Sequence, residues 1–353
     1  MNHQLDMNNF ESLSALNKAQ GQMMTVLPFL TGPLIHHFPK NKEAYLYHCI
    51  DQERGKIPIL GDLYTCQMMP VFNSSESICS RSKKLRIVLH GISSTPKSPY
   101  LAPYVHAAIE SGHDVLCLAL RGALLKGHDH YHAGLTDDIF AVLKDPRLKH
   151  YTDVTILGCS LGGLLALNVA RQCQDDHPKL KGVASICPPI GMQEAQVHLD
   201  RPQQRFYRRF VLTSLKLAYY KLWQQANDHN QPFKSKFWKV MRAKTFADWD
   251  KEVVLPRFGF SSIADYYQKV SINRADLNHL KTDSLLIFDR ADPMVPIAKM
   301  GLEDQEYKEY GKSSVYITKG GGHIGFPFNL DLGLGEKKGI AKQVEFWFSQ
   351  LKH

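Results

Sequence analysis

The chain has 353 residues, of which 44% are hydrophobic and 22% charged, a balance that excludes global disorder and allows a large core. No run of eighteen apolar residues occurs, and the polar N-terminus lacks the pattern of a secretory signal, so no membrane-spanning helix or leader is expected. The net charge is +9, but residues 201–244 alone carry eleven Lys and Arg against one acid, Asp228, so the basicity belongs to this segment.

Short apolar runs alternate with helical patterns along the chain, as in a mostly parallel sheet covered on both faces. Eight runs have the composition of strands: Ala44–Ile50, Leu63–Met68, Arg86–His90, Asp114–Leu120, Asp153–Leu157, Gly182–Cys187, Ser284–Phe288 and Ser313–Thr318. Four segments have a helical pattern: Tyr100–Gly112, Gly134–Leu143, Leu161–Gln172 and Gly339–Leu351. We therefore predict an α/β fold with a mostly parallel eight-stranded sheet and helices on both faces.

One long interval interrupts this alternation. About 96 residues separate the run ending at Cys187 from the run starting at Ser284, far more than one crossover connection needs. We expect residues 190–280 to form an inserted basic helical cap or lid. The core then consists of residues 44–189 and 281–353, and residues 1–43 form an arm packed on it.

The cysteine pattern indicates free thiols. The seven cysteines are odd in number and form no C-x-x-C pair, which favours buried thiols in a reducing compartment and offers no zinc-ligand spacing. The protein is therefore expected in the cytoplasm, with attachment to a membrane surface as the alternative. No metal and no cofactor are expected.

The segment Gly158-Cys159-Ser160-Leu161-Gly162-Gly163 contains a G-x-S-x-G pattern between an apolar strand and a helical run. Such a strand-to-helix turn holds its serine in a strained conformation, and small residues at 158 and 162 let the chain pass. The serine hydroxyl then projects at the carboxyl edge of the sheet, above a helix N-terminus. We predict Ser160 as a nucleophile, with Gly158 and Gly162 as the elbow glycines.

A serine hydroxyl needs a base, which this type of fold supplies from a loop after a late strand. The run ending at Thr318 is followed by three glycines and His323, which we predict as the base. The preceding strand offers two acids, Asp289 and Asp292. Asp292 is preferred because the D-x-x-V-P spacing places it beyond the strand end, whereas Asp289 suits the end of the strand or a turn cap.

An acyl-transfer site also needs donors for the developing oxyanion. The backbone N–H of Leu161, directly after the nucleophile, is one expected donor. The second should come from the loop after the strand ending at His90, where we choose the N–H of Ile92. The alternative for His90-Gly91 is a plain turn at a strand end.

Together these motifs resemble the YheT-like branch of the α/β-hydrolases (the AB hydrolase 4 family) and its ABHD relatives, from about residue 20 onward. The segments that carry the resemblance are Leu89-His90-Gly91, Arg121-Gly122, Tyr131–Asp138, the elbow, Cys187-Pro188-Pro189, Asp265-Tyr266-Tyr267, Ala291-Asp292-Pro293 and Gly321–Phe326. The resemblance implies an α/β-hydrolase fold and hydrolysis of carboxylic esters, with short- or medium-chain acyl groups or lipids as substrates. It places the nucleophile at Ser160, the acid at Asp292 and the base at His323.

Three further hypotheses remain open. The alternating histidines at 128, 130 and 132 could bind a metal on one face of a strand, although they lack the order of a metallohydrolase motif. The basic segment 201–244 could contact an anionic membrane, which would suit a lipase or phospholipase; no recognition motif supports nucleic acid, and a cap helix with solvated arginines is the simpler interpretation. The fold could also serve a non-catalytic binding protein.

Overall fold

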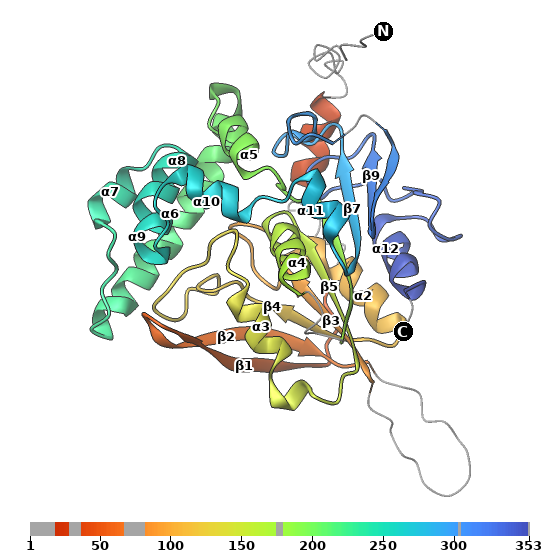
Figure 1. The fold of residues 1–353 in the computed structure, drawn as a ribbon, viewed down its shortest axis with the longest axis horizontal. Helices are drawn as coiled ribbons and strands as arrows, with labels where there is room; N and C mark the ends of the chain where they lie inside the picture. The colour runs from red at the N-terminus through yellow and green to blue at the C-terminus, as the bar shows by residue number, and fades with distance from the viewer. Residues whose placement is uncertain (1–17, 28–36, 67–81, 174–178, 303–304, 352–353) are drawn as a thin grey trace, which may run out of the picture.

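The computed structural model describes the following parts of the chain: residues 18–27, 37–66, 82–173, 179–302 and 305–351. Over these residues the chain forms one sheet with helices on both faces, as predicted, and a group of helices beside it (Figure 1). The first 17 residues and residues 28–36 of the predicted arm lie outside the described part.

The sheet has nine strands among the described residues, not the eight predicted, in the order β1-β2-β4-β3-β5-β6-β7-β9-β8. Pairing is parallel from β4 to β9, whereas β1 with β2, β2 with β4 and β8 with β9 are antiparallel. The strands are β1 Lys42–Asp51, β2 Gly55–Tyr64, β3 Lys84–Leu89, β4 Asp114–Leu118, β5 Asp153–Cys159, β6 Leu180–Ile186, β7 Asp283–Asp289, β8 Tyr307–Tyr310 and β9 Ser313–Thr318.

Two strands differ from the prediction. β8 was not expected, because it has only four residues, of which one is buried, and pairs on one side only. β2 spans Gly55–Tyr64 and overlaps only the start of the predicted run Leu63–Met68, whose residues 67–68 lie outside the described part. A proline within a run argues against a central strand, but Pro58 lies where β2 pairs with β1 alone, since β4 joins only from Gly61 onward.

Helices cover both faces of the sheet. Alanine, valine and aromatic side chains of α2 (Ala102–Glu110) and α12 (Ile340–Ser349) pack in one hydrophobic cluster, on one face. On the other face, α3 (Asp137–Leu143) and α4 (Leu161–Gln172) contribute to a second cluster. Every residue of β5 is buried, as expected for a strand covered on both sides, and the chain turns directly from β5 into α4 at Ser160.

Between β6 and β7 the chain forms helices only, which Figure 1 shows in green to cyan at one side of the sheet. They are α5 Met192–Leu199, α6 Arg205–Asp228, α7 Phe237–Arg242, α8 Phe246–Trp249, a π-helical turn Asp250–Val254, α9 Leu255–Phe258, α10 Ile263–Val270 and α11 Arg274–His279. We call α5 to α11 the inserted helices. Short 3-10 turns occur at Pro99–Leu101, Pro146–Leu148, Pro202–Gln204 and Ile297–Lys299.

A buried group of ion pairs joins the inserted helices to the sheet. Arg257 in α9 donates hydrogen bonds to Asp129 and to Asp51, and Arg121 donates to the same two carboxylates. Asp51 ends β1, so this group connects the β1–β2 turn with the insertion. Each charge is compensated, which is the condition for keeping ionised groups away from water.

Two observations bear on the environment of the chain. No helix of the described residues combines the length and the apolar character that crossing a bilayer requires. The six cysteines that fall within the described residues are free thiols, and all but Cys66 are buried.

Candidate active site

Ser160 lies at the turn from β5 into α4 and has a strained backbone, with φ of 54° and ψ of −122°. A Cβ atom at Gly158 would lie 2.1 Å from the carbonyl oxygen of Gly162, and a Cβ at Gly162 would lie 2.5 Å from that of Leu89. Both positions therefore require glycine for steric reasons, as the elbow pattern predicts. The turn places the Ser160 side chain at the carboxyl edge of the sheet, 7% exposed.

His323 connects two of the other predicted residues by hydrogen bonds. Its Nε2 lies 2.8 Å from the Oγ of Ser160, and its Nδ1 lies 2.8 Å from the Oδ2 of Asp292. An ionised carboxylate can only accept, so Nδ1 carries the proton and donates to Asp292. Nε2 is then the acceptor for the Ser160 hydroxyl, which is the arrangement in which an imidazole can remove the hydroxyl proton.

The two candidate acids have different partners. Asp292 uses Oδ1 to accept from the backbone N–H groups of Met294 and Val295, which leaves Oδ2 for His323. Asp289 instead accepts from the Thr318 hydroxyl and from the backbone of the glycine-rich loop at Gly321. Burial raises the pKa of Asp289, and these hydrogen bonds oppose that rise. Asp289 therefore holds the loop that carries His323, while Asp292 contacts the imidazole.

A contact between the N-terminal arm and this loop was not predicted from the sequence. The hydroxyl of Thr25, in the helical residues 18–27, accepts from the backbone N–H of His323 at 2.8 Å and donates to the carbonyl of Gly21 at 2.7 Å. Gly322 lies so close that a Cβ there would be 2.4 Å from the Gly21 carbonyl oxygen. The same helical segment contacts α6, because Tyr207 donates a hydrogen bond to Gln22.

The loop after β3 lies beside the nucleophile. A Cβ at Gly91 would be 3.2 Å from the Cβ of Ser160, and the N–H of Gly91 donates to the hydroxyl of Tyr100. The N–H of Ser93 donates to Tyr131. In the described part of the chain no acceptor is found for the backbone N–H of Ile92 or of Leu161, and both residues line the cavity that contains Ser160.

His130 and His132, two of the three alternating histidines, are buried in aromatic surroundings. Neither residue lies on a strand, contrary to the metal hypothesis. The ring centroid of His132 lies 4.3 Å from that of Phe258, and the ring centroid of His130 lies 5.3 Å from that of Phe233. Burial lowers the pKa of His130 to about 4 and that of His132 to about 3, so both are neutral at pH 7. Among the described residues, the set of three potential ligand atoms within 4.8 Å of one another belongs to Cys187, Asp292 and His323.

Cys187 is the member of that set with no predicted role. It follows β6 with φ of 48°, and burial raises the pKa of its thiol well above the ordinary value. The thiol is therefore protonated at pH 7 and is a poor metal ligand, because metals bind the thiolate. The other two members of the set are already hydrogen-bonded: His323 bonds to Asp292 through Nδ1 and to Ser160 through Nε2.

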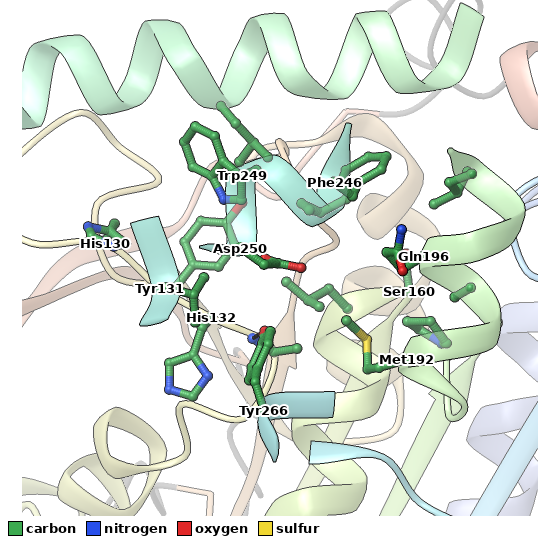
Figure 2. Close-up of a pocket in the computed structure, with 18 of the residues that line it drawn as sticks. His130, Tyr131, His132, Ser160, Met192, Gln196, Phe246, Trp249, Asp250 and Tyr266 are labelled. Atoms are coloured by element: carbon green, nitrogen blue, oxygen red, sulfur yellow. Dashed lines mark hydrogen bonds between the residues drawn. The ribbon is translucent and has the colours of Figure 1, made fainter. Parts of the chain in front are cut away.

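A cavity opens above Ser160 and His323, between the sheet edge and the inserted helices. Figure 2 shows its wall, to which α5, α6 and α8 contribute mostly apolar side chains. Those drawn include Met192, Phe246 and Trp249, while Gln196 and Asp250 are polar. The inserted helices thus shape the space in front of the nucleophile.

Comparison with known proteins agrees with this architecture. The model of the alpha/beta hydrolase family matches residues 87–331, more than half of the chain. The chain therefore belongs to the alpha/beta hydrolase family, and the predicted fold class is confirmed.

Individual relatives are more distant. The chain is 25% identical to phospholipase ABHD3 of Bos taurus over 72% of its own length and 61% of the relative's, and 26% identical to the putative esterase YheT of Escherichia coli K12 over 70% and 72%. The predicted resemblance to YheT-like and ABHD proteins is thereby confirmed, although the chain spans only about three fifths of the phospholipase. Est1E from Butyrivibrio proteoclasticus, solved with ferulic acid bound, matches at 16% identity and a TM-score of 0.47, over 86% of this chain and 97% of the other.

Proposed function

We propose that this chain is a serine hydrolase that cleaves carboxylic esters through an acyl-enzyme, with Ser160 as nucleophile, His323 as base and Asp292 as orienting acid. The supporting observation is the chain of two 2.8 Å hydrogen bonds from Ser160 Oγ through the imidazole to Asp292 Oδ2. The names of the relatives, a phospholipase and a putative esterase, favour esters as the substrate class.

In the proposed reaction the Ser160 proton passes to Nε2 of His323 while Oγ bonds to the ester carbonyl carbon. The N–H groups of Leu161 and Ile92 stabilise the oxyanion, and the C–O bond to the alcohol then breaks as the alcohol takes the proton from Nε2. Water next gives a proton to Nε2, its oxygen bonds to the acyl carbon, and the acid leaves as Oγ regains the proton. Asp292 keeps Nδ1 protonated throughout and stabilises the imidazolium.

We further propose that residues 190–280 act as a cap that selects the substrate, on a core of residues 44–189 and 281–353. Support comes from the cavity wall, which the inserted helices supply with apolar side chains of the kind that buries an acyl chain. Ester hydrolysis of this kind requires no cofactor.

A fluorophosphonate probe tests the proposal, because it reacts with an activated serine. Ser160→Ala should abolish labelling, and Asp289→Asn should retain it better than Asp292→Asn. Hydrolysis of p-nitrophenyl esters of rising chain length would then define the acyl preference. Absent labelling of the wild-type chain would refute the proposal and favour a non-catalytic binding protein.

A second candidate, a lipase acting at an anionic membrane surface, is favoured by one face of α6. Phe206, Phe210 and Leu217 recur at helical spacing and are 66%, 62% and 63% exposed. Arg205 and Arg209 are exposed beside the two phenylalanines. Apolar side chains flanked by basic ones suit insertion among anionic headgroups.

Vesicle co-sedimentation separates this candidate from a fully solvated cap. We expect binding to phosphatidylglycerol vesicles, weak binding to phosphatidylcholine vesicles, and loss of binding in the double variant Phe206→Ser with Phe210→Ser. Ile50→Ser, which alters a 77% exposed residue on β1, is the matched control and should bind like the wild type. Equal failure with both lipids would exclude the membrane role.

A further inference from the structure

Asp250 places a carboxyl group in the mostly apolar wall of the cavity. Among the described residues that line this cavity it is the only acid, and it is 8% exposed. In Figure 2 its carboxyl group points into the cavity that also contains Ser160. The proposed reaction has no use for this group, since the acid that contacts His323 is Asp292.

One oxygen of Asp250 is paired and the other is not. The hydroxyl of Tyr267 donates to Oδ2 at 2.6 Å. Within the described part of the chain Oδ1 has no hydrogen-bond partner. Burial is the main reason why the pKa of Asp250 is raised to about 7; nearby Asp200 adds to the rise, and the Tyr267 hydrogen bond opposes it. A carboxyl group in this position costs folding stability, which a purely structural residue would not require.

The backbone at Asp250 is also irregular. Residues Asp250–Val254 form a π-helical turn between α8 and α9. Such turns are rare, and they occur frequently at functional sites because the extra residue redirects side chains. Two features that independently cost stability, a buried acid and a π-helical turn, thus coincide at one position of the cavity wall.

We propose that Asp250 is a substrate-binding residue that hydrogen-bonds a hydroxyl group of the ester, carried on either the acyl chain or the alcohol. A hydroxyl suits this site because it can donate to the carboxylate and can also accept from the protonated acid. A plain hydrocarbon chain would cover Oδ1 without replacing its lost hydrogen bond to water. Sites built for a substrate hydroxyl discriminate strongly against analogues that lack it. This inference rests on the proposed function.

The test uses fluorophosphonates, in which Ser160 Oγ bonds to phosphorus as fluoride leaves, so no natural substrate is needed. Two matched series carry a hydroxyl at successive carbons, one on the alkyl chain bound to phosphorus and one on the O-alkyl group. These series stand for the acyl and the alcohol side. The measurement is the second-order rate constant of inactivation, divided by that of the unsubstituted probe.

We expect at least one hydroxylated probe to react about tenfold faster than its plain counterpart with the wild-type chain. In Asp250→Leu this preference should vanish, so that the hydroxylated and the plain probe react at similar rates. Asp250→Asn, which keeps the shape and a hydrogen-bonding group, should retain part of the preference and serves if the leucine variant does not fold. Tyr267→Phe, which leaves Oδ1 unchanged, should also retain it.

Three outcomes would overturn the inference: no hydroxyl preference in either series, a preference that persists in Asp250→Leu, or a stronger preference for probes with an amine in place of the hydroxyl. Each of them leaves labelling by the plain probe intact and so differs from failure of the proposed function, in which the wild-type chain reacts with no fluorophosphonate.

Discussion

The hydroxyl of Thr25 accepts a hydrogen bond from the backbone N–H of His323, 298 positions away in the chain. The same hydroxyl donates to the Gly21 carbonyl, so its orientation is fixed. An N-terminal helical segment thereby holds the loop of the predicted base. Tyr207 of α6 donates a hydrogen bond to Gln22 in that segment. The same helical segment therefore contacts both the loop that carries His323 and the inserted helices.

Thr25→Val should slow the reaction of Ser160 with a fluorophosphonate about ten- to a hundredfold, because the loop loses the bond that sets the imidazole position. Thr25→Ser keeps the hydroxyl and should restore the rate to within about threefold. The measurement is the inactivation rate constant alongside the thermal unfolding midpoint. A valine variant that reacts at the wild-type rate would show that the helical segment does not position His323.

Gly162→Ala should prevent correct folding of the elbow, since the added Cβ would lie 2.5 and 2.6 Å from the carbonyl oxygens of Leu89 and His90. These are backbone atoms of β3 and its loop and cannot move without disrupting the sheet. The matched control is Gly259→Ala, where φ is +70° and no atom lies within 4 Å, so only backbone strain of about 1 kcal/mol is expected. Urea unfolding of both variants compares them, and equal losses would contradict the steric argument.

The turn at Ser160 and the positions of Asp292 and His323 in loops that follow strands could be predicted from the sequence because their determinants are local. A buried strand, a small-residue turn and a helix follow one another within about twenty residues, and each has its own periodicity. The choice between Asp289 and Asp292 was also local, since it depended on which residue lies beyond the strand end.

The contacts of Thr25 and Asp250 could not be predicted in this way. Thr25 contacts a loop near the other end of the chain, and no pattern in the sequence around Thr25 indicates that contact. Asp250 lies among short helices whose packing decides which side chains enter the cavity. The alternating histidines at 130 and 132 do not share one face of a strand, because the segment that carries them is not a strand.

Asp250→Asn should stabilise the chain most at neutral and alkaline pH. The raised folded-state pKa of about 7, against 3.8 when exposed, means that the folded chain holds the proton more tightly, so wild-type stability falls as pH rises from about 4 to about 7. The variant has no titrating group at this position and lacks this loss. The difference in unfolding free energy between the two proteins should therefore grow over that range and then level off. A difference in unfolding free energy that does not depend on pH would refute the raised pKa of Asp250. The groups that interact electrostatically with Asp250 are present in both proteins; they are Tyr266, Tyr267 and Asp200.

Asp129→Asn should destabilise the attachment of the inserted helices by about 3–5 kcal/mol, because it leaves two buried guanidinium groups with less negative charge. Asp129 is 1% exposed and accepts from both Arg121 and Arg257 at 2.7–2.9 Å. The control is Glu306→Gln, which removes an exposed ion pair to Lys319 and should change stability little.

Equilibrium urea unfolding measures both losses, and fluorophosphonate labelling reports whether the cavity is still formed. Since Arg257 belongs to α9 and Arg121 to the core, weakening this group should affect the insertion before the sheet. We expect Asp129→Asn to lose its selectivity among probes of different chain length, or with and without a hydroxyl, at urea concentrations where Ser160 is still labelled. Loss of labelling and of sheet structure in one common transition would instead show that cap and core unfold as a single unit.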